Sequence, residues 1–186
     1  MWHGSIAAGT ADATPRIGLM PGIPRPRLRR APRVGADAPH AHSSPEPNVE
    51  TIEAHGLRWI NIERPGPIDR AWLEEHFEFH PLDYEDVGSR NQRPKIDEYP
   101  DYLFIVLHFP VFDKTVGRLN AAELDMFVGP DFLITLPNEP IDPVEYLFER
   151  CRTREDVREQ YFSKGPGYLL YKICLLYTSP SPRDRS

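Results

Sequence analysis

A short acidic stretch holds the side chains of this sequence that are best suited to chemistry, and it reads His80-Pro81-Leu82-Asp83-Tyr84-Glu85-Asp86. Proline favours the first helical position, so a helix is predicted to begin at Pro81. On that helix Asp83 and Asp86 lie three residues apart and share a face, while Glu85 points elsewhere. Two carboxylates on one face can hold a hydrated Mg²⁺ or Ca²⁺ ion, because these ions prefer oxygen ligands and often keep waters.

The same residues also have a simpler interpretation. Acidic side chains near the N-terminus of a helix stabilise it through the helix dipole, without any bound ion. His80 fits an N-cap or a packing residue better than a metal ligand, because no second histidine stands at a metal-binding spacing.

Motifs of the common enzyme classes are absent from the sequence. It contains no Gly-rich phosphate loop, no G-x-S-x-G and no H-E-x-x-H, and neither cysteine lies beside an obvious histidine base. His108 stands inside an apolar run and is expected in the core or at an interface. We therefore expect no enzyme activity. The alternative from that class is a metal-dependent hydrolase built on His80, Asp83 and Asp86, which would need a cleft that gathers all three.

Length and charge restrict the remaining classes of protein. The 186 residues suit one ordinary domain, and two cysteines cannot form a disulfide scaffold. No apolar run approaches the roughly 18–20 residues of a membrane span. Of the net charge of −6, residues 1–48 carry +3 and residues 174–186 carry +1, so residues 49–173 carry −10. An acidic body argues against a nucleic-acid partner and is compatible with a cation partner.

The composition divides the chain into three segments. Residues 1–48 contain eight of the 21 prolines and an arginine cluster, and we expect them to be disordered. Residues 49–173 carry the fold. Residues 174–186 read CLLYTSPSPRDRS, which resembles an in-frame translation of a sequencing adaptor, so we expect a non-native tail on the truncated start of a longer protein.

Signals for strands and helices alternate along residues 49–173. Strands are predicted at 58–63, 95–99, 102–109, 123–128 and 132–136, and helices at 67–77, 81–87, 143–151, 154–162 and from 167 onward. Residues 102–109 are apolar on both faces, which is typical of a central strand in a covered sheet. Trp59 is expected to fill the layer between sheet and helices. The order of elements predicts an α/β fold in which helices cover the sheet.

The order of the motifs RWINIE, FHPLDYEDV, NQRPKIDEYPDYLFIVLHFPVFD, ELDMFVGPDFLITL and GPGYLLYKI resembles the cytosolic N-terminal domain of the CorA family of magnesium transporters. The resemblance covers about residues 55–173. It implies a mixed β-sheet layered between helices, an α/β/α sandwich, in each subunit of a homopentamer. It also implies that a missing C-terminal part holds the stalk and the membrane helices. The parent transporter would then lie in the cell membrane, with this domain in the cytoplasm.

The resemblance also implies a metal site. The family holds regulatory Mg²⁺ between neighbouring cytosolic domains, and its acidic pair matches Glu85 and Asp86 here. Asp86 is the principal candidate ligand, Glu85 the second, and Asp83 joins them from the spacing argument above. The opposing carboxylates of the family come from regions beyond this chain, so we expect half of a weak Mg²⁺ site.

The predicted function is therefore the regulatory, cation-sensing portion of a magnesium or cobalt transporter, whose partners are divalent cations and further copies of the chain. Basic groups of the QRPK motif are expected to pair with nearby carboxylates. Two other interpretations stay open, a zinc-exporting member of the same family and a free-standing soluble module for metal sensing or oligomerisation.

Overall fold

The computed structural model describes residues 46–89, 92–113, 115 and 117–178. The predictions for residues 1–45 and 179–186 lie outside this part. The described elements, in chain order, are β1 (Glu50–Ala54), β2 (Leu57–Asn61), α1 (Pro67–His76), α2 (Pro81–Gly88), β3 (Lys95–Glu98), β4 (Leu103–Asp113), β5 (Arg118–Val128), β6 (Phe132–Pro137), α3 (Asp142–Thr153), α4 (Glu155–Phe162) and α5 (Pro166–Thr178).

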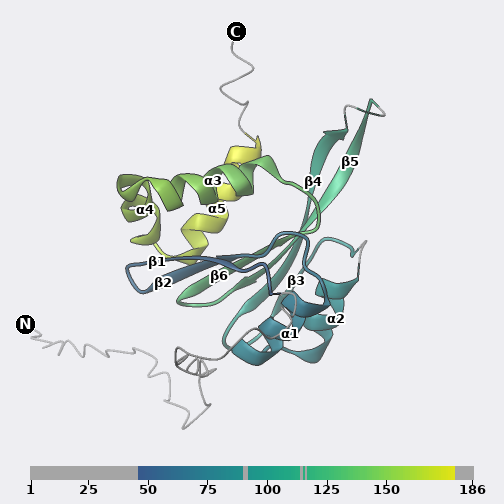
Figure 1. Cartoon of the computed structure of the whole chain (residues 1–186), viewed down its shortest axis with the longest axis horizontal. Coiled ribbons are helices and arrows are strands. Elements are labelled where there is room, and N and C mark those ends of the chain that lie inside the picture. Colours follow the sequence, from purple (N-terminus) through teal and green to yellow (C-terminus); the bar gives the residue numbers. More distant parts are fainter. Residues whose placement is uncertain (1–45, 90–91, 114, 116, 179–186) are drawn as a thin grey trace, which may run out of the picture.

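One mixed six-stranded sheet, in the order β1-β2-β6-β5-β4-β3, forms the middle layer. Strands β2 and β6 run parallel, and the other neighbours are antiparallel. Helices α1 and α2 cover one face, and α3, α4 and α5 cover the other (Figure 1). The predicted α/β/α sandwich with a mixed sheet is confirmed.

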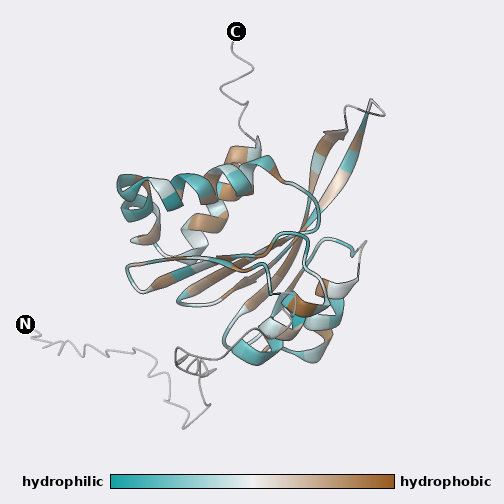
Figure 2. Ribbon diagram, in the orientation of Figure 1, coloured by the Kyte–Doolittle hydropathy of each residue, from teal (hydrophilic) through white to brown (hydrophobic). Residues whose placement is uncertain are grey.

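Alternation along the central strands builds a core on each side of the sheet. On β5, Leu124 and Met126 pack under α3, α4 and α5, while Phe127 packs under α1 and α2. Figure 2 shows hydrophobic residues concentrated on the central strands and α4 largely hydrophilic. Because side chains of a strand point to alternate faces, a strand buried on both faces needs a helical layer on each.

Two details show how local sequence builds this arrangement. Trp59 is fully buried, its ring meets Phe148 edge-on at 5.0 Å between centroids, and its indole Nε1 donates to Thr135 Oγ1 at 3.1 Å. Its predicted place between sheet and helices is confirmed. In the turn between β5 and β6, a Cβ on Gly129 would come within 2.2 Å of the Phe132 ring, so only glycine fits there.

Several elements differ from the sequence prediction. Strand β1 was missed because it is an edge strand in which only Ile52 is buried, so its apolar signal is weak. It joins β2 through a tight turn in which His55 and Gly56 both have positive φ. Strands β4 and β5 extend further, pairing as far as Asp113 and Arg118, and form an arm that projects beyond the helical layers (Figure 1).

Helix α5 begins close to the predicted start at residue 167 and continues through Thr178, past the predicted end of the folded segment at residue 173. Tyr177 lies against Phe109 with ring centroids 4.8 Å apart, and its hydroxyl donates to the backbone oxygen of Pro110 at 3.3 Å. Residues 174–178 therefore belong to the fold, although the non-native origin of residues 174–186 stays a prediction. Among the described residues, no helix is both long and apolar enough to cross a bilayer.

We expect Tyr177→Ala to lower the free energy of unfolding by about 1–2 kcal/mol, because it removes a partly buried aromatic contact and a hydrogen bond. Urea denaturation measures this change. The matched control is Tyr171→Ala on the same helix, since Tyr171 is 53% exposed. Equal stability of the two variants would show that residues 174–178 do not pack on the sheet.

One carboxylic acid lies inside the sheet core. Asp125 on β5 has no exposed surface, and neither of its side-chain oxygens has a hydrogen-bond partner among the described residues. Burial, followed by the charges of Glu123 and Asp86, raises its pKa to about 8, and the charge of Lys95 opposes this rise. A buried carboxylate without a partner is costly, so the folded protein favours the protonated acid at neutral pH.

Asp125→Asn should therefore stabilise the protein progressively between pH 4 and pH 8. In that window the folded wild type keeps a proton that the unfolded chain, with a pKa near 3.8, releases, so wild-type stability falls as the pH rises. The limiting slope for one group is about 1.4 kcal/mol per pH unit. Urea denaturation across this range, without divalent cations, measures the difference. If the free energies of unfolding of wild type and variant changed in parallel with pH, the expectation would be contradicted. The control is Asp156→Asn on α4, which changes an exposed aspartate.

Candidate functional site

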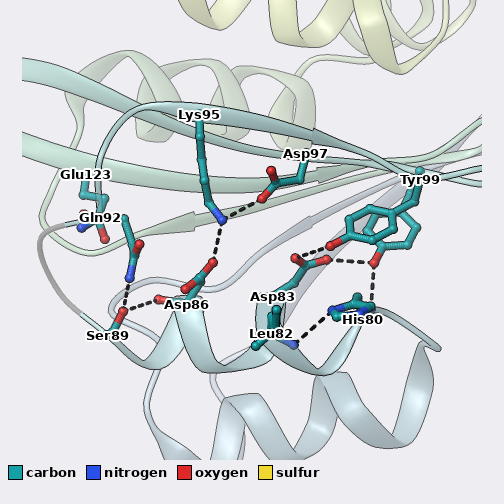
Figure 3. Close-up of polar contacts among 11 residues, drawn as sticks. His80, Leu82, Asp83, Asp86, Ser89, Gln92, Lys95, Asp97, Tyr99 and Glu123 are labelled. Carbon is teal, nitrogen blue, oxygen red and sulfur yellow. Dashed lines mark hydrogen bonds and ion pairs between the residues drawn. The ribbon is translucent and has the colours of Figure 1, made fainter.

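Helix α2 opens as the sequence predicted, with His80 at the N-cap. The ring Nδ1 of His80 accepts a hydrogen bond from the backbone N–H of Leu82 at 3.3 Å, and the ring stacks on Tyr99 with centroids 5.6 Å apart (Figure 3). The cap satisfies an otherwise unpaired helix N–H. The predicted N-cap role of His80 is confirmed by this geometry.

Asp83 points inward from α2 and is held by two tyrosines. It is 1% exposed, and its carboxylate accepts hydrogen bonds from the hydroxyls of Tyr99 at 3.0 Å and Tyr102 at 2.7 Å. Burial raises the pKa of Asp83, although the two tyrosine hydrogen bonds lower it. Burial together with Asp83 raises the pKa of Tyr99 to about 12, so this phenol remains a donor near pH 7. These contacts hold α2 against the segment that connects β3 and β4.

Asp86 lies one turn further along α2 and forms an ion pair with the sheet. The ammonium Nζ of Lys95 on β3 lies 2.6 Å from a carboxylate oxygen of Asp86 and 2.6 Å from one of Asp97 (Figure 3). Partial burial lowers the pKa of Lys95, but the two carboxylates outweigh it and raise the pKa above its usual value. The expected pairing of the QRPK motif with nearby carboxylates is confirmed for Lys95.

The structure gathers Asp83 and Asp86 with Asp97, which the sequence analysis missed. One oxygen of each residue lies within 4.8 Å of the others, so the three offer an all-oxygen donor set suited to a hard cation. Glu85 is exposed and points away from this set, as its spacing predicted. The signal for Asp97 was its position two residues after Lys95 in a strand, which places both side chains on one face.

A second acidic pair lies further along the same face of the sheet. Glu123 is 6% exposed, and its carboxylate accepts hydrogen bonds from the backbone N–H of Gln92 and from Asn138 Nδ2, both at 2.7 Å. His108 Nε2 lies 3.6 Å from a carboxylate oxygen of Glu123, and the His108 side chain is 30% exposed, so it lies at the edge of the core and not within it. Asp125 follows on the same strand face, and an aspartate within the apolar run ELDMFV was its available sequence signal.

The geometry does not favour a hydrolase built on His80, Asp83 and Asp86. His80 is engaged as a cap, Asp83 by tyrosine hydroxyls and Asp86 by Lys95. A pocket of about 330 Å³ is lined by other residues: Gln92, Arg93, Pro94, His108, Ala121, Glu123, Asn138 and Glu139. The three candidate residues therefore do not share this pocket.

Two proteins with sequences similar to this chain carry names that describe them as metal ion transporters. The chain is 33% identical over 127 residues to the "Putative metal ion transporter YfjQ" of Bacillus subtilis, which covers 67% of this chain and 37% of that protein. It is 29% identical over 118 residues to the cobalt/magnesium transport protein CorA of Thermotoga maritima, covering 62% of this chain and 32% of that protein. The chain thus spans about a third of the length of these relatives.

The fold is also found among solved structures. The soluble domain of CorA from Methanocaldococcus jannaschii superimposes with a TM-score of 0.53 at 23% identity, covering 63% of this chain and 45% of that chain. The family model for the CorA-like Mg²⁺ transporter protein matches residues 54–179, which span nearly all of the described sheet and helices. This chain therefore belongs to the CorA-like Mg²⁺ transporter family.

Proposed function

We propose that this chain forms the cytosolic, divalent-cation-sensing domain of a magnesium or cobalt transporter of the CorA type. The observation that carries the proposal is family membership combined with the position of Glu85 and Asp86 on α2, where the family's acidic pair is expected. A relative bears the name cobalt/magnesium transport protein. The family is one of transporters, which agrees with the expectation that the chain is no enzyme.

In this proposal the chain supplies half of a regulatory Mg²⁺ site, and a neighbouring copy in a homopentamer supplies the other half. A site with few direct ligands and retained waters binds Mg²⁺ weakly, which suits an ion that is abundant in the cell. When Mg²⁺ is low, carboxylates that face one another across the subunit boundary repel and favour a more open assembly.

Lys95 changes the ranking of the candidate ligands. Lys95 already pairs with Asp86, whose side chain is 21% exposed. The ammonium of Lys95 therefore partly neutralises the negative charge that Asp86 offers to an ion at the subunit surface. Glu85 is exposed and presents its full charge. We therefore propose Glu85 as an equal partner of Asp86, and Asp83, held by its tyrosines, as a support.

The proposal places the parent transporter in the cell membrane with this domain on the cytoplasmic side. Membrane attachment then comes from a part of the protein that follows the domain. The acidic body of residues 49–173 attracts divalent cations and repels nucleic acid, which fits this placement.

The test is a chimaera in which residues 49–178 replace the matching domain of Thermotoga maritima CorA. In proteoliposomes with Mg²⁺ on the domain side, we expect cation uptake to fall as Mg²⁺ rises. Glu85→Gln and Asp86→Asn should each raise the Mg²⁺ concentration needed for half-inhibition about fivefold or more, because each removes one charge from the shared site.

The control variant is Glu155→Gln, which changes an exposed acid on α4 in the opposite helical layer. It should leave the Mg²⁺ dependence unchanged. A functional chimaera in which Glu85→Gln and Asp86→Asn both behave like the parent would refute the sensing role. A chimaera that fails to form pentamers on size analysis would refute the proposed assembly.

A further inference from the structure

A pocket of about 330 Å³ is bounded by two strands and two connecting segments. Strands β4 and β5 contribute His108, Ala121 and Glu123 to its lining. The segment from α2 to β3 contributes residues 92–94, and the segment from β6 to α3 contributes residues 138 and 139. This volume is at the lower end of the range for small-molecule pockets, which favours a small ligand.

Glu123 is the most deeply buried charged group that lines the pocket. It is 6% exposed, and its carboxylate accepts hydrogen bonds from the backbone N–H of Gln92 and from Asn138 Nδ2, both at 2.7 Å. Both donors are uncharged. Within the described residues, its only ion-pair partner is His108, whose Nε2 lies 3.6 Å away. A carboxylate has about four lone-pair sites, so this one can still accept hydrogen bonds from a ligand, and a positively charged donor suits it best.

Two further charged residues line the pocket without an ion pair of their own. Arg93 and Glu139 are exposed, and in the part of the chain that the structure describes neither side chain forms a salt bridge. The guanidinium of Arg93 and the carboxylates of Glu123 and Glu139 therefore surround one pocket without neutralising one another. A simple cation is repelled by Arg93, and a simple anion is repelled by the two carboxylates. The lining is complementary to a ligand that carries both charges.

We propose that this pocket binds a small zwitterion of the free α-amino acid class. The carboxylate of the ligand pairs with Arg93, because a guanidinium binds a carboxylate through two parallel hydrogen bonds. The ammonium of the ligand binds the carboxylates of Glu123 and Glu139. Pro94 and Ala121 offer an apolar surface to a short side chain. This site goes beyond the proposed cation sensing, because its ligand is organic and the acidic residues of α2 do not line the pocket.

Hydrogen bonds connect the pocket to the end of α2. Gln92, whose backbone N–H donates to Glu123, also donates from its side chain to Ser89 Oγ. Ser89 Oγ in turn donates to the backbone oxygen of Asp86 at 3.2 Å (Figure 3). A ligand bound to Glu123 therefore restrains residues 92–94 and the last turn of α2. In the bound state, we expect backbone amides of this region to exchange their hydrogens more slowly.

The test measures binding to the 186-residue chain. The probes are the standard L-amino acids, each at about 10 mM in a thermal-unfolding assay without divalent cations. We expect at least one of them to raise the melting temperature by about 2 °C or more. Isothermal titration calorimetry then gives its dissociation constant, and hydrogen exchange shows whether residues 92–94 are protected.

Single-charge analogues test whether both charges are read. For the amino acid that binds, the amine without the carboxylate and the acid without the ammonium should each bind about tenfold more weakly. For alanine these analogues are ethylamine and propionate.

Variants of two exposed residues test the location. Arg93→Gln and Glu139→Gln should each raise the dissociation constant about fivefold or more, because each removes a charge that pairs with the ligand. Arg152→Gln on α3 and Glu155→Gln on α4 are the matched controls, since they change exposed residues of the same types in the opposite helical layer. Both controls should bind like the wild type.

The inference is overturned if no amino acid raises the melting temperature, or if the amine or the acid alone binds as tightly as the amino acid. It is also overturned if Arg93→Gln and Glu139→Gln both bind like the wild type, since the ligand then lies elsewhere. The assay involves neither transport nor a divalent cation, so its outcome is independent of the cation-sensing proposal.

Discussion

The whole arrangement depends on burying both faces of the central strands. Strands β5 and β6 carry apolar side chains in both directions, so each face requires a helical layer. Helices α3, α4 and α5 cover one face of the sheet, and α1 and α2 cover the other. Helix α2 thereby lies beside the edge strand β3, whose sequence KIDE is mostly charged, and Asp86 pairs with Lys95 there. The acidic groups of α2 therefore meet charged residues of the sheet because of a hydrophobic constraint.

The carboxylates at this junction are stabilised in different ways. Asp83 receives two tyrosine hydroxyls, and Asp86 shares the ammonium of Lys95 with Asp97. Within the described part of the chain, Asp125 has no hydrogen-bond partner, and burial favours its protonated form at neutral pH. The packing of α2 on the sheet therefore depends on how each of these carboxyl groups is compensated.

Much of the fold was predictable where local chemistry and burial agree. Clear signals came from the prolines at the starts of α1 and α2 and from the apolar run of β4. The helical spacing also predicted that Asp83 and Asp86 share one face of α2 while Glu85 points elsewhere. Strand β1 was not predicted because an exposed edge strand has little apolar pattern. The outer parts of β4 and β5 were not predicted because their residues are polar or exposed. The proximity of Asp97 and Asp125 to α2 depends on strand register across the sheet, which a single sequence does not specify.

The parallel pairing of β2 with β6 has a consequence for how the protein is made. Arg58 is aligned with Phe132, seventy-four residues later in the chain. On the ribosome, the first hairpin emerges early and has no partner for its inner edge until the sixth strand has been translated. Such long-range closure slows folding, and the unpaired edge is a site for wrong pairing in the meantime. Newly made chains should thus be most vulnerable to aggregation just before the last strand leaves the exit tunnel.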